Sequence, residues 1–90
     1  MREDLRKNIM PTLLIIFGLR FYFYSNDHEP IHIHVQSVDG VAKFEILKEV
    51  VMISNTGLKT KDLKLAESII EENLENFREG WHKFFNEEEI

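Results

Sequence analysis

The strongest constraint on the fold is a pair of runs, residues 31–37 and 42–47, in which apolar and polar side chains alternate. Alternation with a period of two is typical of a strand that buries one face. Asp39-Gly40 lies between the two runs, and an Asp-Gly dipeptide in this position is a strong signal for a tight β-turn. These residues are therefore predicted to form an antiparallel hairpin.

A two-residue loop at Asp39-Gly40 would fix the register of this hairpin. It pairs apolar residues on one face: Val38 with Val41, Val35 with Phe44, and Ile33 with Ile46. On the other face it places His34 opposite Glu45 and Gln36 opposite Lys43. Because a shift of one residue would exchange the two faces, the apolar face is predicted to be buried and the histidine face to lie away from the core.

Strands are also predicted on both sides of this hairpin. Residues 12–17 and 20–25 are rich in β-branched and aromatic side chains, and Gly18-Leu19 between them suits a type II′ turn. A tight turn after residue 47 would lead into a fifth strand, residues 50–54, which pairs Phe44 with Ile53 and continues the core face.

After residue 60 the apolar residues recur at helical spacing, and Phe77 and Trp81 are predicted to anchor this segment on the sheet. Thr60 is the predicted N-cap. The helix is expected to reach about residue 85, with Gly80 as the point where it bends or divides. The predicted fold class is therefore α+β: an antiparallel meander of about five strands, with one long helix or two shorter ones packed on one face.

The composition fits one small domain. The chain has 90 residues, of which 43% are apolar and 30% are charged. Residues 1–9 are polar without an apolar period and are predicted to be an N-terminal extension, so that the domain spans residues 10–90. The lack of cysteine excludes disulfides and thiolate metal sites, and no apolar run approaches the roughly 18 residues of a membrane span. We therefore expect a cytoplasmic protein without a membrane partner.

The net charge of −5 belongs wholly to the C-terminal third. Residues 1–60 carry seven basic and seven acidic side chains, whereas residues 61–90 carry four basic and nine acidic ones. Nucleic acid binding needs a basic surface that neutralises phosphates, so this balance does not favour a nucleic acid partner.

Three of the four histidines fall within residues 28–34. His32 and His34 are two apart in a predicted strand, which sends both imidazoles to the same face. His28 lies in the preceding loop, and Glu45 is expected opposite His34, where a carboxylate could orient the ring. The pattern is typical of a metal site or an acid–base pair, and equally of a polar strand face without function.

The candidate catalytic residues are therefore His28, His32, His34 and Glu45. No cofactor is certain, but the three histidines are candidate ligands for a divalent metal such as zinc, with Asp27 or His82 as other sources of a third ligand. For RNA cleavage, paired histidines could act as general base and acid. The candidate binding residues around them are Arg20, Tyr22, Tyr24, Asp27 and Lys43.

The N-terminal hairpin has more apolar surface than one core face can use. If Leu14 and Ile16 face the core, the opposite face presents a second apolar set: Leu13, Ile15, Phe17, Tyr22 and Tyr24. An exposed apolar strand surface that bears tyrosines is a usual mark of a partner site. This face is therefore predicted to bind a small protein partner or a second copy of the chain.

A longer string identifies a resemblance. Residues 21–30, Phe-Tyr-Phe-Tyr-Ser-Asn-Asp-His-Glu-Pro, followed by His32-Ile33-His34-Val35, resemble the small bacterial proteins grouped as domain of unknown function 4160. The likeness covers about residues 10–86, with Ile31 where members usually have a second proline. It implies a bacterial cytosolic protein whose gene neighbours that of a second small protein, the pair being toxin–antitoxin-like. It implies no established activity.

Two hypotheses follow for the function. The first is an interaction protein, one component of a toxin–antitoxin-like module of two proteins. The alternative is a small nuclease or metal-assisted hydrolase that uses His28, His32 and His34. Converging imidazoles would favour the enzyme, and imidazoles spread into solvent would favour a polar face without catalysis.

Overall fold

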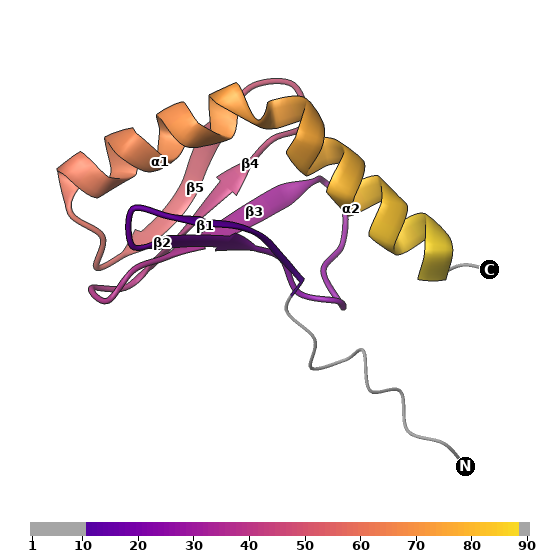
Figure 1. The fold of residues 1–90 in the computed structure, drawn as a ribbon, viewed down its shortest axis with the longest axis horizontal. Coiled ribbons are helices and arrows are strands. Elements are labelled where there is room, and N and C mark those ends of the chain that lie inside the picture. The colour runs from indigo at the N-terminus through magenta and orange to yellow at the C-terminus, as the bar shows by residue number, and fades with distance from the viewer. Residues whose placement is uncertain (1–10, 89–90) are drawn as a thin grey trace, which may run out of the picture.

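The computed structural model describes residues 11–88, which form a five-stranded antiparallel sheet and two helices (Figure 1). Neighbouring strands follow the chain order: β1 (Thr12–Ile16), β2 (Leu19–Tyr22), β3 (His32–Gln36), β4 (Val41–Glu45) and β5 (Val51–Thr56). The helices α1 (Thr60–Glu72) and α2 (Leu74–Glu88) cover one face of the sheet (Figure 1). The predicted α+β meander is confirmed, whereas the predicted extension at residues 1–9 lies outside the described residues.

The β3–β4 hairpin forms as predicted, but its register differs by two residues. Val35 pairs with Ala42 and Ile33 with Phe44, because the loop has four residues, 37–40, rather than two. The backbone N–H of Ser37 donates to the Gly40 carbonyl across this loop, at 2.9 Å. A two-residue shift leaves every side chain on its predicted face, so Ile33, Val35 and Phe44 are buried as expected.

Gly40 supplies a physical reason for the longer loop. A Cβ atom at this position would overlap the carbonyl oxygen of Thr56 at the end of β5. The glycine is therefore needed for close approach between two backbones and not for the expected two-residue turn. Val38, which the predicted register placed in a core pair, is fully exposed at the tip of the loop.

The β1–β2 turn is also displaced from its predicted position. Phe17 and Gly18 occupy it, with φ angles of 54° and 75°, and Ile16 pairs with Leu19. Two positive φ angles are typical of a type I′ turn. Leu19 is 1% exposed, so the register that places it in the core prevails over the one that placed it in the turn.

The β4–β5 register agrees with the prediction over Ala42–Asn55 and Lys43–Ser54 but then shifts at a bulge. Phe44 therefore pairs with Met52 and not with Ile53. The expectation that β5 continues the core face is wrong, because all six of its residues are exposed. The core is instead completed by the helices.

The C-terminal helical region divides at Asn73 and not at Gly80. The Asn73 side-chain amide donates to the Ile69 carbonyl at 2.8 Å, and its backbone N–H lies 3.1 Å from the carbonyl oxygens of both Ile69 and Ile70. The amide takes up a carbonyl of the last turn of α1, so Asn73 acts as its C-cap. Lys59, in an extended conformation, is the N-cap, and the predicted cap Thr60 is the first helical residue.

Aromatic side chains join α2 to the sheet, as predicted. Trp81 is 2% exposed and lies 5.2 Å from Phe23, while Phe77 lies 5.7 Å from Phe21, measured between ring centroids. Rings at these separations add to the stability gained from burial alone. Neither helix within residues 11–88 has the length and apolar character needed to cross a membrane.

Candidate functional site

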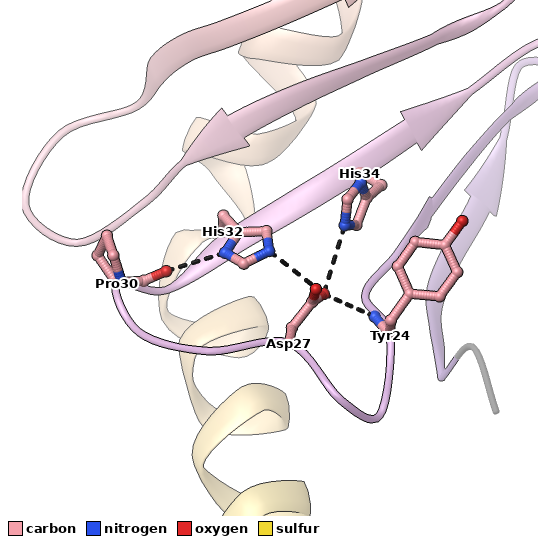
Figure 2. A network of polar contacts seen from close by, with 5 residues as sticks. All are labelled: Tyr24, Asp27, Pro30, His32 and His34. Carbon is pink, nitrogen blue, oxygen red and sulfur yellow. Dashed lines mark hydrogen bonds and ion pairs between the residues drawn. The ribbon is translucent and has the colours of Figure 1, made fainter. Parts of the chain in front are cut away.

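The connection between β2 and β3 folds back so that the Asp27 carboxylate faces the polar side of β3 (Figure 2). One of its oxygens, Oδ2, is the common point of three contacts. It accepts a hydrogen bond from the Tyr24 backbone N–H at 2.7 Å, and it lies 3.2 Å from His32 Nε2 and 3.3 Å from His34 Nε2. We refer to Asp27, His32 and His34 as the His/Asp cluster.

Local structure explains why the cluster forms. The Asp27 backbone N–H donates to the Tyr24 carbonyl at 3.0 Å while the Asp27 side chain accepts from the Tyr24 N–H, so residues 24–27 close a tight turn. His32 and His34 alternate along β3 and therefore project from one face. The side chains are only 9%, 14% and 16% exposed for His32, His34 and Asp27, respectively.

The two nitrogens of His32 are both engaged. Its Nδ1 atom lies 2.9 Å from the carbonyl oxygen of Pro30, and a carbonyl oxygen can only accept, so Nδ1 carries a hydrogen (Figure 2). If the imidazole is neutral, Nε2 therefore carries no hydrogen, and its lone pair points at the Asp27 carboxylate. Two acceptors at 3.2 Å repel each other. A proton or a metal ion held between Nε2 and the carboxylate would remove this repulsion.

His34 lies in an aromatic environment. Its ring stacks on Tyr22 with 5.3 Å between centroids and meets the edge of Tyr24 at 4.9 Å. Burial lowers the pKa of His34, and the nearby Asp27 carboxylate partly opposes this. Burial also raises the pKa of Tyr22 to about 12, with a further contribution from its hydrogen bond with the Tyr24 side chain. The guanidinium of Arg20 lies 4.8 Å from the centre of the Tyr22 ring.

An open pocket of about 430 Å³ adjoins the His/Asp cluster. Asp27 and His32 lie on its wall, together with residues from the β2–β3 connection, β4 and β5: Asn26, His28, Glu29, Pro30, Lys43, Glu45 and Ile53. The pocket therefore brings a carboxylate, an ammonium group and an exposed imidazole to the edge of the cluster.

The structure corrects the predicted neighbours of the histidines. Glu45 lies opposite His32, and Lys43 lies opposite His34, because the β3–β4 register is shifted by two residues. Both side chains remain on the predicted polar face. The prediction that Glu45 supports His34 is wrong, while the predicted location of Glu45 and Lys43 beside the histidines agrees with the lining of the pocket.

The group that could hold a metal ion differs from the predicted trio of histidines. One ligand atom each from Asp27, His32 and His34 lies within 4.8 Å of the others. His28 is exposed on the pocket wall, and His82 is exposed on α2, so neither belongs to this group of described residues. A tetrahedral zinc ion with bonds of about 2.0–2.1 Å separates its ligand atoms by about 3.3 Å. The separations of Asp27 Oδ2 from the two histidine nitrogens, 3.2 Å and 3.3 Å, match that value, whereas the three ligand atoms together are held only within 4.8 Å of one another.

The predicted partner face on the N-terminal hairpin is only partly exposed. Ile15 and Phe17 are 68% and 71% exposed, whereas Tyr22 is buried and stacks on His34. Leu13 packs against the core, because the register shifts between Thr12 and Leu14 and turns Leu13 away from its expected face.

The sequence analysis also missed the Pro30 carbonyl as a partner of His32, since no side-chain pattern reveals a backbone acceptor.

The fold and the site together define a small α+β protein with a His/Asp cluster between β3 and the β2–β3 connection, where the His32 ring also lies 5.3 Å from Trp81 of α2. Residues 18–82 match the family described as domain of unknown function (DUF4160), and the chain belongs to this family. No curated protein and no solved structure matches the chain.

Proposed function

We propose that this protein is a small metal-assisted hydrolase in which Asp27, His32 and His34 hold a divalent transition metal ion. One observation carries the proposal: His32 Nε2 lies 3.2 Å from the Asp27 carboxylate while Nδ1 of the same ring lies 2.9 Å from the carbonyl oxygen of Pro30. A cation between the ligand atoms removes the repulsion between Nε2 and the carboxylate. A backbone carbonyl on the far nitrogen is also the usual support of a metal-binding histidine.

The number of ligands favours a catalytic site over a structural one. Structural zinc sites have four protein ligands, whereas catalytic sites have three and keep a position for water. The cluster supplies three among the described residues and lies beside an open pocket. A metal ion bound there would make a water molecule acidic enough to attack a substrate near neutral pH.

Other pocket residues fit roles in hydrolysis. Glu45 pairs with His32 and lines the pocket, so in this proposal it would accept a proton from the attacking water, and Lys43 would stabilise negative charge that develops on the substrate. A nuclease that uses His32 and His34 as free acid and base is less well supported. His32 has neither nitrogen available to a substrate while it contacts Pro30 and Asp27.

Metal binding can be measured without an assay of activity. Protein treated with a chelator should bind one Zn²⁺ or Co²⁺ in calorimetry, and Co²⁺ should give visible absorption bands. Asp27→Asn keeps the shape of the side chain and its contact with Tyr24 but removes the charge, so it should lose binding. His28→Ala and His82→Ala are matched controls, and both should bind as the wild type does.

A metal-free cluster has its own signature. If the extra charge is a proton, His32 carries hydrogens on both nitrogens near neutral pH, and ¹⁵N NMR of the ring would show an imidazolium that added Zn²⁺ leaves unchanged. That result would remove the metal from the proposal and leave the cluster as a clamp for the β2–β3 connection. Zinc binding without turnover of phosphodiester, ester or peptide probes would retain the metal site and reject the hydrolase.

A second candidate function is that of an interaction protein in a toxin–antitoxin-like module. It is favoured by the exposure of Ile15 and Phe17 at the tip of the β1–β2 hairpin, where they contribute little to the core. Co-expression with the product of an adjacent small gene, which the family resemblance implies, should give a complex that survives size-exclusion chromatography. Ile15→Ser with Phe17→Asn should abolish that complex, because asparagine tolerates the positive φ of residue 17 while removing its ring.

A further inference from the structure

We propose that a second copy of this chain pairs with the free edge of β5, so that two five-stranded sheets join into one around a two-fold axis. This inference is independent of the proposed function. It starts from the exposure of β5, whose residues Val51, Met52 and Ile53 are 47%, 49% and 50% exposed. No other strand among residues 11–88 lies along this edge.

The sequence of β5 lacks the usual protection of a sheet edge. Edge strands commonly carry lysine, another charge or proline, which prevents pairing with a second chain. Val51–Thr56 contains none of these. In many sheets a bulge protects an edge strand by twisting it away from a partner. In β5, Val51, Met52 and Ile53 are about half exposed beside the bulge. The opposite edge, β1, also lacks lysine, other charges and proline and has Ile15 68% exposed, but its Leu13 and Leu14 pack against the core.

The chemistry of this edge favours an identical strand as the occupant. In an antiparallel pair centred on Met52, Val51 faces Ile53 of the second copy, so apolar side chains meet on both sides of the axis. The flanking Glu49 and Lys48 then face Asn55 and Thr56, and no like charges are opposed. A two-fold interface uses the same patch twice, and this patch is self-complementary in that register. A partner selected by charge would find no charged side chain on β5 itself.

Pairing at β5 would also affect the candidate site. Ile53 lines the pocket beside the His/Asp cluster, and Val51 lines a second cavity of about 200 Å³ with Glu45, Leu47, Lys48 and Glu49. In the Met52-centred register, Val51 of the second copy lies against Ile53. The second copy would therefore form part of the wall on the open side of the pocket.

The test uses Met52, which lies opposite Met52 of the second copy in the proposed register. The wild-type full chain should be a dimer in sedimentation equilibrium, and Met52→Lys should raise the dissociation constant about 100-fold or more, because two lysines would meet at the axis. Met52→Glu alone should also be monomeric, and an equimolar mixture of the two variants should form a heterodimer. Phe17→Lys, at the far edge of the sheet, is the matched control and should remain dimeric.

Circular dichroism melts of each variant establish that it is folded, as expected for substitutions at half-exposed positions. A wild-type chain that stays monomeric at millimolar concentration overturns the proposal. So does a dimer that resists Met52→Lys, or one that dissociates on Phe17→Lys. None of these outcomes depends on metal binding or on hydrolysis.

Discussion

Arg78 Nε donates to the carbonyl oxygen of Ile46 at 2.9 Å and so ties α2 to the end of β4. The same guanidinium donates through Nη2 to the carbonyl oxygens of Leu47 and Lys48, at 2.9 and 3.0 Å. One side chain thus satisfies three consecutive carbonyls in the turn that leads to β5. A guanidinium can do this because its donors are fixed in one plane.

Arg78→Ala should therefore lower the free energy of unfolding by about 2 kcal/mol, because hydrogen bonds from a charged donor are lost at three acceptors. Urea denaturation at neutral pH measures the change. Glu75→Gln is the control: Glu75 also contacts Arg78, at 3.2 Å, but is 85% exposed, and surface ion pairs contribute little. Equal effects of the two substitutions would show that the carbonyl contacts do not stabilise the turn.

Asp27→Ala should destabilise the metal-free protein by about 1–3 kcal/mol, because the Tyr24 N–H loses the partly buried acceptor that closes the turn. Asp27→Asn should cost less, since an amide oxygen can still accept from Tyr24. Chemical denaturation in the presence of a chelator separates this effect from metal binding. A destabilisation by asparagine as large as that by alanine would assign the stabilisation to the charge alone.

Trp81→Ala should destabilise the protein by about 3–5 kcal/mol, because it leaves a large cavity between α2 and the sheet. The substitution also removes a ring that lies 5.3 Å from His32. Trp81 is the only tryptophan, so circular dichroism and not fluorescence must follow the unfolding. A loss of less than about 1 kcal/mol would show that Trp81 is peripheral to stability.

Gly40→Ala and Gly18→Ala should differ in a way that separates steric overlap from backbone strain. A Cβ on Gly40 would overlap backbone atoms of Thr56, so the β3–β4 loop and β5 must move apart, at a cost of about 3 kcal/mol. A Cβ on Gly18 meets nothing within 4 Å, and only its φ of +75° opposes alanine, at about 1 kcal/mol. Thermal melts of both variants under one set of conditions provide the comparison.

The stability of the protein should fall as the pH rises from 10 to 12. In the unfolded chain Tyr22 ionises near its ordinary pKa of 10.0, whereas the fold raises this pKa to about 12. The unfolded state therefore loses the proton first, so the contribution is fully present below pH 10 and is lost towards pH 12. Free energies of unfolding measured between pH 9 and 12 should show the decline. Tyr22→Phe should reduce it, because phenylalanine has no proton to lose.

Sequence periodicity alone determined which residues of β3 and β4 face the core and which face the candidate site. Alternation at period two survives a register shift of two residues, so Ile33, Val35 and Phe44 are buried despite the incorrect pairing. The helical spacing likewise located Trp81 in the core. These features follow from local geometry.

Tertiary contacts decided the features that the local pattern left open: the strand register, the end of the first helix and the members of the His/Asp cluster. The approach of Gly40 to Thr56 selects a four-residue loop, which moves Glu45 from His34 to His32. The side chain of Asn73, and not Gly80, ends the first helix. The return of the β2–β3 connection brings Asp27 to His32 and His34 in place of His28. Each outcome depends on the energy of a contact between groups that no local repeat relates, and so only the folded chain determines it.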